Sequence, residues 1–276
     1  MYALIGVCLV LSYRVGAVIN FSQTFTACFA VFVMSELLDH GWNLWLAIAV
    51  ALALGAAIAA FQGWLMARLF SEATVLVRST VTIGMAISFY GLTVRIFHDT
   101  LRTFPPLFKS IRFKIGTVTV TGAVTASILG AIGISLVVWL VLSRTRIGVI
   151  LRAVSGRPTT AELMGVRTRR YIIGVWGLAG LLTTAAMVLT ASTRRSIPNL
   201  AFLVVPALAA AVVGSMRSFL LTVIGGIAIG TIESVALQYQ RTNGFGIGQY
   251  RPALSFVMVT LALLWSQRRV TWGEAR

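Results

Sequence analysis

The chain consists of long apolar runs separated by short polar breaks, which predicts a series of membrane-spanning helices. A run of 18 or more apolar residues is the usual mark of such a helix. Six runs reach this length: residues 2–19, 44–69, 80–97, 121–143, 172–192 and 219–237; the runs 200–216 and 251–265 are shorter candidates. With a shorter run at 24–38, the pattern predicts about eight or nine membrane segments, some of them short or broken.

A polar break, Asn20-Phe21-Ser22-Gln23, separates the first two apolar runs. The run that follows, 24–38, is barely long enough to cross a bilayer. It fits either an ordinary tilted span or a broken helix, which a membrane tolerates only where protein or a cavity surrounds it. Asn20 either caps the next helix or lines a pathway. Arg14 is costly in lipid and should face the bundle or the cytoplasmic interface.

Small residues recur at four-residue spacing on two of these runs. Gly55, Ala59 and Gly63 share one face of the 44–69 run, and Gly226 and Gly230 share a face of the 219–237 run. Such stripes allow two helix backbones to approach closely. The sequence therefore predicts tight helix packing at both places.

Residues 144–171 form the longest polar interruption, with seven arginines and one acid, Glu162. Ile147, Ile150, Leu151 and Val154 share one helical face, which predicts a first helix, and Gly156 and Pro158 end it. Thr159 with Glu162 is a capping-box pattern, so a second short helix is predicted there, and Gly165 can end it. A compact folded loop of this kind favours docking of a partner. A basic loop that only fixes the topology is the alternative.

Composition agrees with a membrane protein. Hydrophobic residues make up 58% and charged residues 11% of the chain, and the mean hydropathy is +0.91. A soluble domain has roughly 25% charged residues. We therefore expect one integral domain, residues 1–276, that is an all-α helix bundle in the plasma or inner membrane. The formal charge of +16 indicates loops that face anionic lipid and an acidic partner, and no nucleic-acid-binding module is recognisable.

The loop charges predict an orientation. If residues 144–171 lie in the cytoplasm, Arg78, Arg217 and the basic tail do too, and the loop 98–120 lies outside. That outer loop ends in KIGTVTV, whose alternation predicts a small β-element.

The chain offers little material for catalysis or for binding a cofactor. Cys8 and Cys28 lack metal-ligand spacing, and His40 and His98 are far apart. We expect no metal site, no catalytic residues and no enzyme activity. The phosphate-loop pattern G-x-x-x-x-G-K-[ST] is missing, so a partner or an ion gradient must supply energy.

The run IGVILRAVSGRPTTAELMGV resembles the cytoplasmic signature of LivH/LivM-type permeases, the membrane subunits of branched-chain amino-acid ABC importers. That signature, G-x-x-[LI]-R-A-x-x-x-x-x-x-A-x-x-x-G-[IV], falls on Gly148, Leu151, Arg152, Ala153, Ala161, Gly165 and Val166. YALIGVCLVLSYRVGAVINF resembles the family's first span, which ends in Asn-Phe. VVGSMRSFLLTVIGGIAIGTIES resembles its glycine-rich penultimate region.

The chain departs from the family pattern in three places, and the first two, after Asn-Phe and at Arg14 in the same span, lie where a broken helix could line the pathway. The family commonly continues Asn-Phe with Ala-His-Gly-Glu, whereas this chain has Ser22-Gln23-Thr24-Phe25. The Gly-Gly-x-Gly-Ser pattern is reduced to Val212-Val213-Gly214-Ser215-Met216. These changes bear on the substrate more than on the fold.

The resemblance implies one permease of an importer for an amino acid or a similar small polar solute. Its partners would be a second permease subunit, identical or different, ABC ATPase subunits that bind the ATP, and an extracytoplasmic solute-binding protein. The predicted ATPase-coupling residues are Arg152, Ala153, Thr159, Ala161, Glu162 and Gly165. The predicted pathway-lining residues are Asn20, Ser22, Gln23, Gly214 and Glu233.

An ion-coupled secondary transporter is the alternative function. Such transporters use intramembrane acids or histidines as relays. Here only Glu36 and Glu233 lie near membrane depth, and the sequence shows no relay partner for either. A membrane enzyme is less favoured still.

Overall fold

The computed structural model describes residues 1–16, 18–98, 101–104, 112–115, 118–156, 158–190, 194–243 and five helical positions between 256 and 264. The predicted last span, 251–265, and the tail therefore lie largely outside the described residues. The helices are α1 Tyr2–Gly16, α2 Gln23–Asp39, α3 Leu44–Leu69, α4 Val75–Phe97, α5 Gly122–Arg144, α6 Arg146–Gly156, α7 Pro158–Leu163, α8 Thr168–Thr190, α9 Ile197–Ala201, α10 Val204–Val213 and α11 Phe219–Asn243. The strands are β1 Arg102–Thr103, β2 Arg112–Ile115, β3 Val118–Thr121 and β4 Arg194–Arg195.

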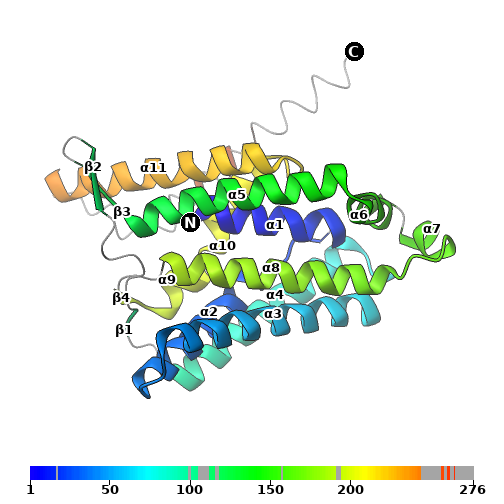
Figure 1. Ribbon diagram of the computed structural model, residues 1–276, viewed down its shortest axis with the longest axis horizontal. Coiled ribbons are helices and arrows are strands. Elements are labelled where there is room, and N and C mark those ends of the chain that lie inside the picture. The colour runs from blue at the N-terminus through cyan, green and yellow to red at the C-terminus, as the bar shows by residue number, and fades with distance from the viewer. Residues whose placement is uncertain are drawn as a thin grey trace, which may run out of the picture.

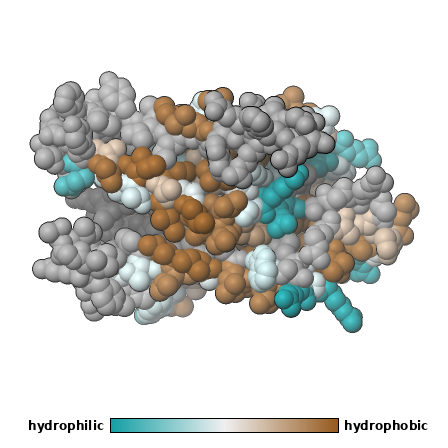
Figure 2. Space-filling view, turned by 90° about the horizontal axis from the view of Figure 1, so that it is seen from above, coloured by the Kyte–Doolittle hydropathy of each residue, from teal (hydrophilic) through white to brown (hydrophobic). Residues whose placement is uncertain are grey.

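The long helices lie roughly along one axis and form a bundle (Figure 1). Within the described residues, four segments are long and apolar enough to cross a membrane: Leu44–Leu69, Val75–Phe97, Thr168–Leu189 and Phe219–Ala236. Shorter apolar helices accompany them, among them α1 and the α9–α10 region. Figure 2 shows hydrophobic side chains across the middle of one face and hydrophilic ones toward the ends. The predicted all-α membrane bundle with short or broken helices is confirmed.

Helix α1 lies at the centre of the bundle and contacts α5, α8, α10 and α11. It is apolar on all sides, as a helix without a solvent face must be. Gly226 packs against it so closely that an added Cβ would lie 2.4 Å from the backbone of Ala3. Arg14, in its last turn, lies with its guanidinium carbon 5.2 Å from the centre of the Phe219 ring. The prediction that Arg14 faces the bundle is confirmed.

The predicted small-residue face of α3 packs against α8. A Cβ added to Gly55 would lie 2.1 Å from Oγ1 of Thr184, and one added to Gly63 would lie 2.7 Å from Cβ of Trp176. From the other side, a Cβ on Gly180 would lie 2.3 Å from Cβ of Ala59. The two helices are in backbone contact, so only glycine fits at these positions.

Two helix breaks shape the interior. The first helix ends at Gly16 and the next begins at Gln23, so the predicted polar break separates α1 from α2. The predicted short segment 200–216 corresponds to the apolar stretch Ile197–Val213, which divides into α9 and α10 around Phe202 and Leu203. Pro206 explains this second break. Proline has no N–H to donate to the carbonyl of Phe202 one turn earlier, and its ring excludes that carbonyl.

Opposite ends of the bundle carry different elements (Figure 1). The predicted β-element is confirmed as a β2–β3 hairpin with Arg112 opposite Thr121. Strands β1 and β4 pair nearby, with Arg102 opposite Arg195. Helices α6 and α7 lie at the other end, which agrees with the predicted placement of the two loops on opposite sides of the membrane.

We expect Gly180→Val to lower the free energy of unfolding by about 1–3 kcal/mol, because it overfills the α3–α8 contact. Gly174→Val is the matched control on the same helix, since a Cβ there meets nothing within 4 Å. Thermal unfolding of both variants in detergent measures the difference. Equal unfolding temperatures for the two variants would show that the α3–α8 contact is not tight.

Candidate functional site

The loop between α5 and α8 folds as predicted into a helix, a break and a short helix. Helix α6 ends at Gly156 and α7 begins at Pro158. Thr159 therefore lies inside α7 and is not its N-cap, which corrects the predicted capping box. The reason is that proline already has the backbone angle of a first helical turn. The side chains of Arg152 and Thr159 lie outside the described residues, so their roles stay predictions.

Gly165 ends the short helix in the predicted way. Its φ is +81°, in the left-handed region that favours glycine. Its N–H donates to the carbonyl of Glu162 at 2.9 Å, and the N–H of Val166 donates to the carbonyl of Ala161 at 3.0 Å. This bonding pattern is the Schellman motif. Ala161 is buried beneath the turn, and Ala153 is exposed on α6.

The prediction that Glu162 caps its own helix is wrong. Its Oε1 accepts a hydrogen bond from Oγ1 of Thr168, the first residue of α8. Thr168 is buried, so the contact ties the end of α7 to the start of α8. Sequence reasoning missed Thr168 because a six-residue gap across a turn has no periodic signal.

The tip of this loop presents two exposed apolar side chains. Leu163 is 89% exposed and Met164 is 79% exposed. Exposed apolar residues on a rigid projection favour contact with another protein. The sequence signal was an apolar pair directly before the glycine of a polar loop, and it was missed.

The α1–α2 break is buried, and its polar groups bond to one another. Oδ1 of Asn20 accepts from the N–H of Ser22 at 3.1 Å and from its Oγ at 2.7 Å. Asn20 thus shapes the break, while Ser22 occupies the N-cap position of α2. Asn20, Ser22 and Gln23 are each at most 1% exposed.

The same break is connected to the surrounding helices. Oγ of Ser22 lies 3.0 Å from Oε1 of Gln62 on α3. Nε2 of Gln23 donates to Oγ1 of Thr183 on α8, and Oε1 of Gln23 accepts from Ser12 on α1 at 3.4 Å. In this conformation these predicted pathway residues hold four helices together.

A cavity of about 610 Å³ lies beside the break, between α1, α2, α4, α9, α10 and α11. Glu233 lines it and accepts a hydrogen bond from the hydroxyl of Tyr2. From the break and α2, it is Phe21 and Phe25 that face the cavity. Gly214 is instead buried at the end of α10, where a Cβ would lie 2.2 Å from Oγ1 of Thr222. The structure therefore brings Glu233 to the cavity, and the pathway assignment of Asn20, Ser22, Gln23 and Gly214 stays a prediction.

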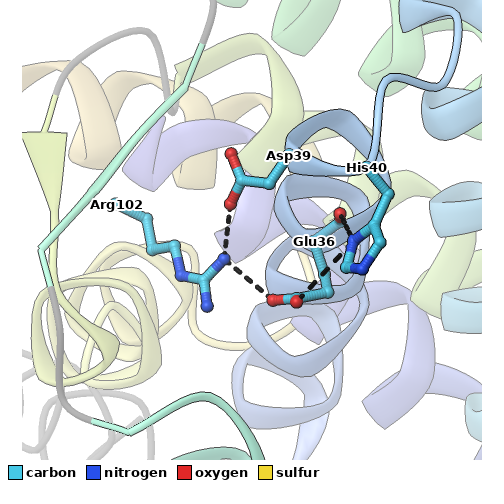
Figure 3. Close-up of polar contacts among 4 residues, drawn as sticks. All are labelled: Glu36, Asp39, His40 and Arg102. Atoms are coloured by element: carbon cyan, nitrogen blue, oxygen red, sulfur yellow. Dashed lines mark hydrogen bonds and ion pairs between the residues drawn. The ribbon is translucent and has the colours of Figure 1, made fainter.

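The C-terminal end of α2 is held by ion pairs (Figure 3). Nη1 of Arg102 lies 2.9 Å from Oε2 of Glu36 and 2.7 Å from Oδ2 of Asp39. Its guanidinium lies 5.9 Å from the centre of the Phe97 ring. Since Arg102 belongs to β1, these contacts fasten the outer loop to α2. The ring of Phe104, after β1, adds a buried contact with Phe32.

Comparison with known proteins identifies the family. The family model described as "Branched-chain amino acid transport system / permease component" matches residues 1–265. The chain belongs to this permease family. It is therefore a multi-pass plasma-membrane protein, in a family of transport components rather than of enzymes.

Three curated relatives of this permease are named as permease proteins, and two of these names state a substrate. The chain is 30% identical to a probable branched-chain amino acid transport permease protein LivH of Methanocaldococcus jannaschii, over 46% of this chain and 41% of that one. It is 28% identical to the galactose/methyl galactoside import permease protein MglC of Haemophilus influenzae, over 76% and 64%. It is 26% identical to the inner membrane ABC transporter permease protein YjfF of Escherichia coli, over 81% and 64%. The permease thus spans less than two thirds of each relative, and no solved structure matches.

Cysteine labelling of the permease tests the break. We expect Asn199→Cys, at an exposed position lining the cavity, to react with a water-soluble reagent at rest. Ser22→Cys and Gln23→Cys should react only during transport, because both side chains are buried in this conformation. The native cysteines are buried and give little background. If positions 22 and 23 stay unreactive in every transport state, they do not line a pathway.

Arg102→Gln should lower the free energy of unfolding of the permease by about 1 kcal/mol, a modest loss because Glu36 and Asp39 are both partly exposed. Arg95→Gln is the control. It removes an exposed arginine from the last turn of α4, which precedes β1 in the chain. Thermal unfolding at low and high salt measures both. The difference should shrink in high salt, and no difference at low salt would contradict the ion-pair argument.

Proposed function

We propose that the chain is a permease of an ABC importer, with transport driven by ATP hydrolysis in partner ATPase subunits. Family membership supports a transport component. The single observation that carries the coupling assignment is the projecting helix α7, which ends in a Schellman turn and is fastened to α8 through Glu162 and Thr168. A loop that only fixed the topology would need no such internal bonds.

Helix α7 is the proposed docking element for an ATPase. Leu163 and Met164 provide apolar contact area, and exposed arginines flank the loop at Arg144, Arg146 and Arg167. A groove with an apolar floor and acidic rim would complement this surface. Glu162 and Gly165 would preserve the conformation of α7 while the ATPase subunits move, and Ala161 is buried on its inner side. Arg152 and Thr159 belong to the same proposed unit.

The translocation pathway is proposed to include the cavity at Glu233 and the neighbouring α1–α2 break. Irregular backbone at membrane depth is tolerated where protein or a cavity surrounds it, and transport sites are often built at such breaks. Asn20, Ser22 and Gln23 would reach the pathway if α2 moves relative to α3 and α8. Gly214 would act through the packing of α10 on α11.

The proposed cargo is an amino acid or a similar small polar solute. The family description and the relative LivH support an amino acid, and the relative MglC extends the range to sugars. The proposed partners are the ATPase subunits, a second permease subunit, identical or different, and an extracytoplasmic solute-binding protein. Uptake of labelled leucine and labelled galactose by the reconstituted complex would separate the two solute classes.

Gly165→Val and Glu162→Lys should each leave the permease inserted and folded but lower uptake roughly tenfold or more. Valine at a positive φ costs about 1–2 kcal/mol, which destabilises the turn that ends α7. Lysine at 162 removes the acceptor for Thr168 and adds a cation to a basic loop. Uptake and ATP hydrolysis are measured on complexes in liposomes, and hydrolysis should persist without transport.

Matched controls show whether a loss of uptake is specific to α7 or follows from any similar substitution elsewhere. Glu72→Lys makes the same charge change in the exposed α3–α4 loop, and Gly174→Val adds the same side chain to an open helix position. Both should transport normally. Near-normal uptake in Gly165→Val and Glu162→Lys would show that α7 is not the coupling element. Transport by the purified chain without ATPase subunits would instead favour an ion-coupled carrier.

A further inference from the structure

The cavity beside the α1–α2 break is lined mainly by apolar side chains. They come from aliphatic residues, prolines and three phenylalanines, and the polar side chains of the described lining are those of Tyr2, Asn199 and Glu233. The volume of about 610 Å³ lies within the range of about 300–1,000 Å³ that is usual for small-molecule sites. The cavity therefore has room for a small solute, most of whose surface would contact apolar groups.

Glu233 supplies the negative charge of this cavity. It is the one acid among the lining residues that the structure describes, and none of those residues is an arginine, a lysine or a histidine. Glu233 is 5% exposed, so water solvates its carboxylate poorly. The hydroxyl of Tyr2 donates to Oε2, and a carboxylate offers about four acceptor positions. A ligand with N–H donors and a positive charge would therefore bind strongly here.

Aromatic rings form another part of the cavity wall. Phe25 and Phe202 both line it, with ring centres 5.7 Å apart and ring planes at 78°. The ring centre of Tyr90 lies 6.2 Å from that of Phe25 and 5.9 Å from that of Phe202. Aromatic rings pack well against apolar groups, and their faces are negative and attract cations. The three rings thus suit an apolar body that is attached to a cation.

The backbone beside the cavity offers few donors for an anion. The first turn of α10 lines it with Val204, Val205 and Pro206. Pro206 has no N–H, and the N–H of Val205 already donates to the carbonyl of Phe202 at 3.1 Å. A carboxylate, or the several hydroxyl groups of a sugar, would leave polar groups without partners against such a wall, which opposes binding. The positive end of the α10 dipole favours an anion, so a ligand with a carboxylate is an informative competitor.

We propose that this cavity binds a solute that combines an ammonium group with an apolar body, and that Glu233 is the residue that selects the ammonium group. The apolar body lies against Phe25 and Phe202. The inference rests on the proposed function, because it takes the bound solute to be the cargo. It narrows that cargo to amines, including amino acids and their amides, and disfavours sugars.

The test measures binding of radiolabelled leucinamide to the purified full chain in detergent, at a slightly acidic pH where leucinamide is a cation. Unlabelled 4-methylpentanamide has the same body without the amine. It should compete about tenfold more weakly than unlabelled leucinamide, or worse, because a hydrogen bond to a charged group contributes at least that factor. Leucine, which has a carboxylate in place of the amide, should compete more weakly than leucinamide, and galactose should not compete.

Variants assign the selectivity to Glu233. Glu233→Gln keeps the shape of the side chain and removes its charge, so it should weaken leucinamide binding roughly tenfold or more and change 4-methylpentanamide binding by less than about twofold. A purely structural role would weaken both ligands alike. Glu233→Asp keeps the charge and should retain a preference for leucinamide. Glu72→Gln, in the exposed α3–α4 loop, is the control and should bind both ligands as the original chain does.

A further variant tests the aromatic wall without touching the acid. Phe202 is 52% exposed, so the fold should tolerate Phe202→Leu. This change keeps an apolar side chain and removes the ring face. It should weaken leucinamide binding about two- to fivefold, the usual effect of a cation–ring contact, and affect 4-methylpentanamide less.

Three results would overturn the proposal. The first is absence of saturable leucinamide binding, or equal competition by 4-methylpentanamide, which would indicate an apolar cavity without charge selection. The second is unchanged leucinamide affinity in Glu233→Gln, or an equal loss for both ligands. The third is stronger competition by leucine or galactose than by leucinamide. If binding follows the expected pattern but the complex with ATPase subunits shows no ATP-driven uptake, the proposed function fails and the cavity assignment stands.

Discussion

Every backbone N–H and C=O inside a bilayer must find a partner in the protein, and this constraint governs the arrangement of the molecule. Two interrupted stretches, α1–α2 and α9–α10, leave backbone groups that helices would otherwise satisfy. The first interruption is buried, and at the second Leu203 is buried while Phe202 is exposed. At the first, Asn20 and Ser22 bond the free groups locally, and Gln62 and Thr183 close the network from neighbouring helices. The long helices α3 and α8 thus form a shell that supplies hydrogen-bond partners to the α1–α2 break.

The sequence predicted most of the shell, because long apolar runs and small-residue stripes are local signals. The bounds of α3 were predicted without error, and the Gly55–Ala59–Gly63 face was identified before its partner α8 was known. The turn at Gly165 was also predictable, because a glycine after a short polar helix has one common use. The α9–α10 break was missed although Pro206 marked it, since apolar content alone suggested one continuous segment.

The contacts that define the candidate site were not predictable. That Glu162 bonds Thr168, or that Phe21 rather than Ser22 faces the cavity, depends on how each helix is rotated within the bundle. Rotation is set by packing against neighbours far away in sequence, and no pattern in the chain encodes it directly. The same holds for Arg102, whose partners lie on a helix separated from it by two spans.

The hydrogen bond between Glu162 and Thr168 connects α7 directly to the first residue of α8. One end of α8 is bonded to α7, and α8 is packed closely against α3 at Gly180 and Thr184. Thr183 lies about 22 Å along α8 from Thr168, at the rise of an ideal helix, and holds Gln23 in the α1–α2 break. A displacement of α7 would therefore have a continuous route to the α1–α2 break, through Thr168, helix α8 and Thr183.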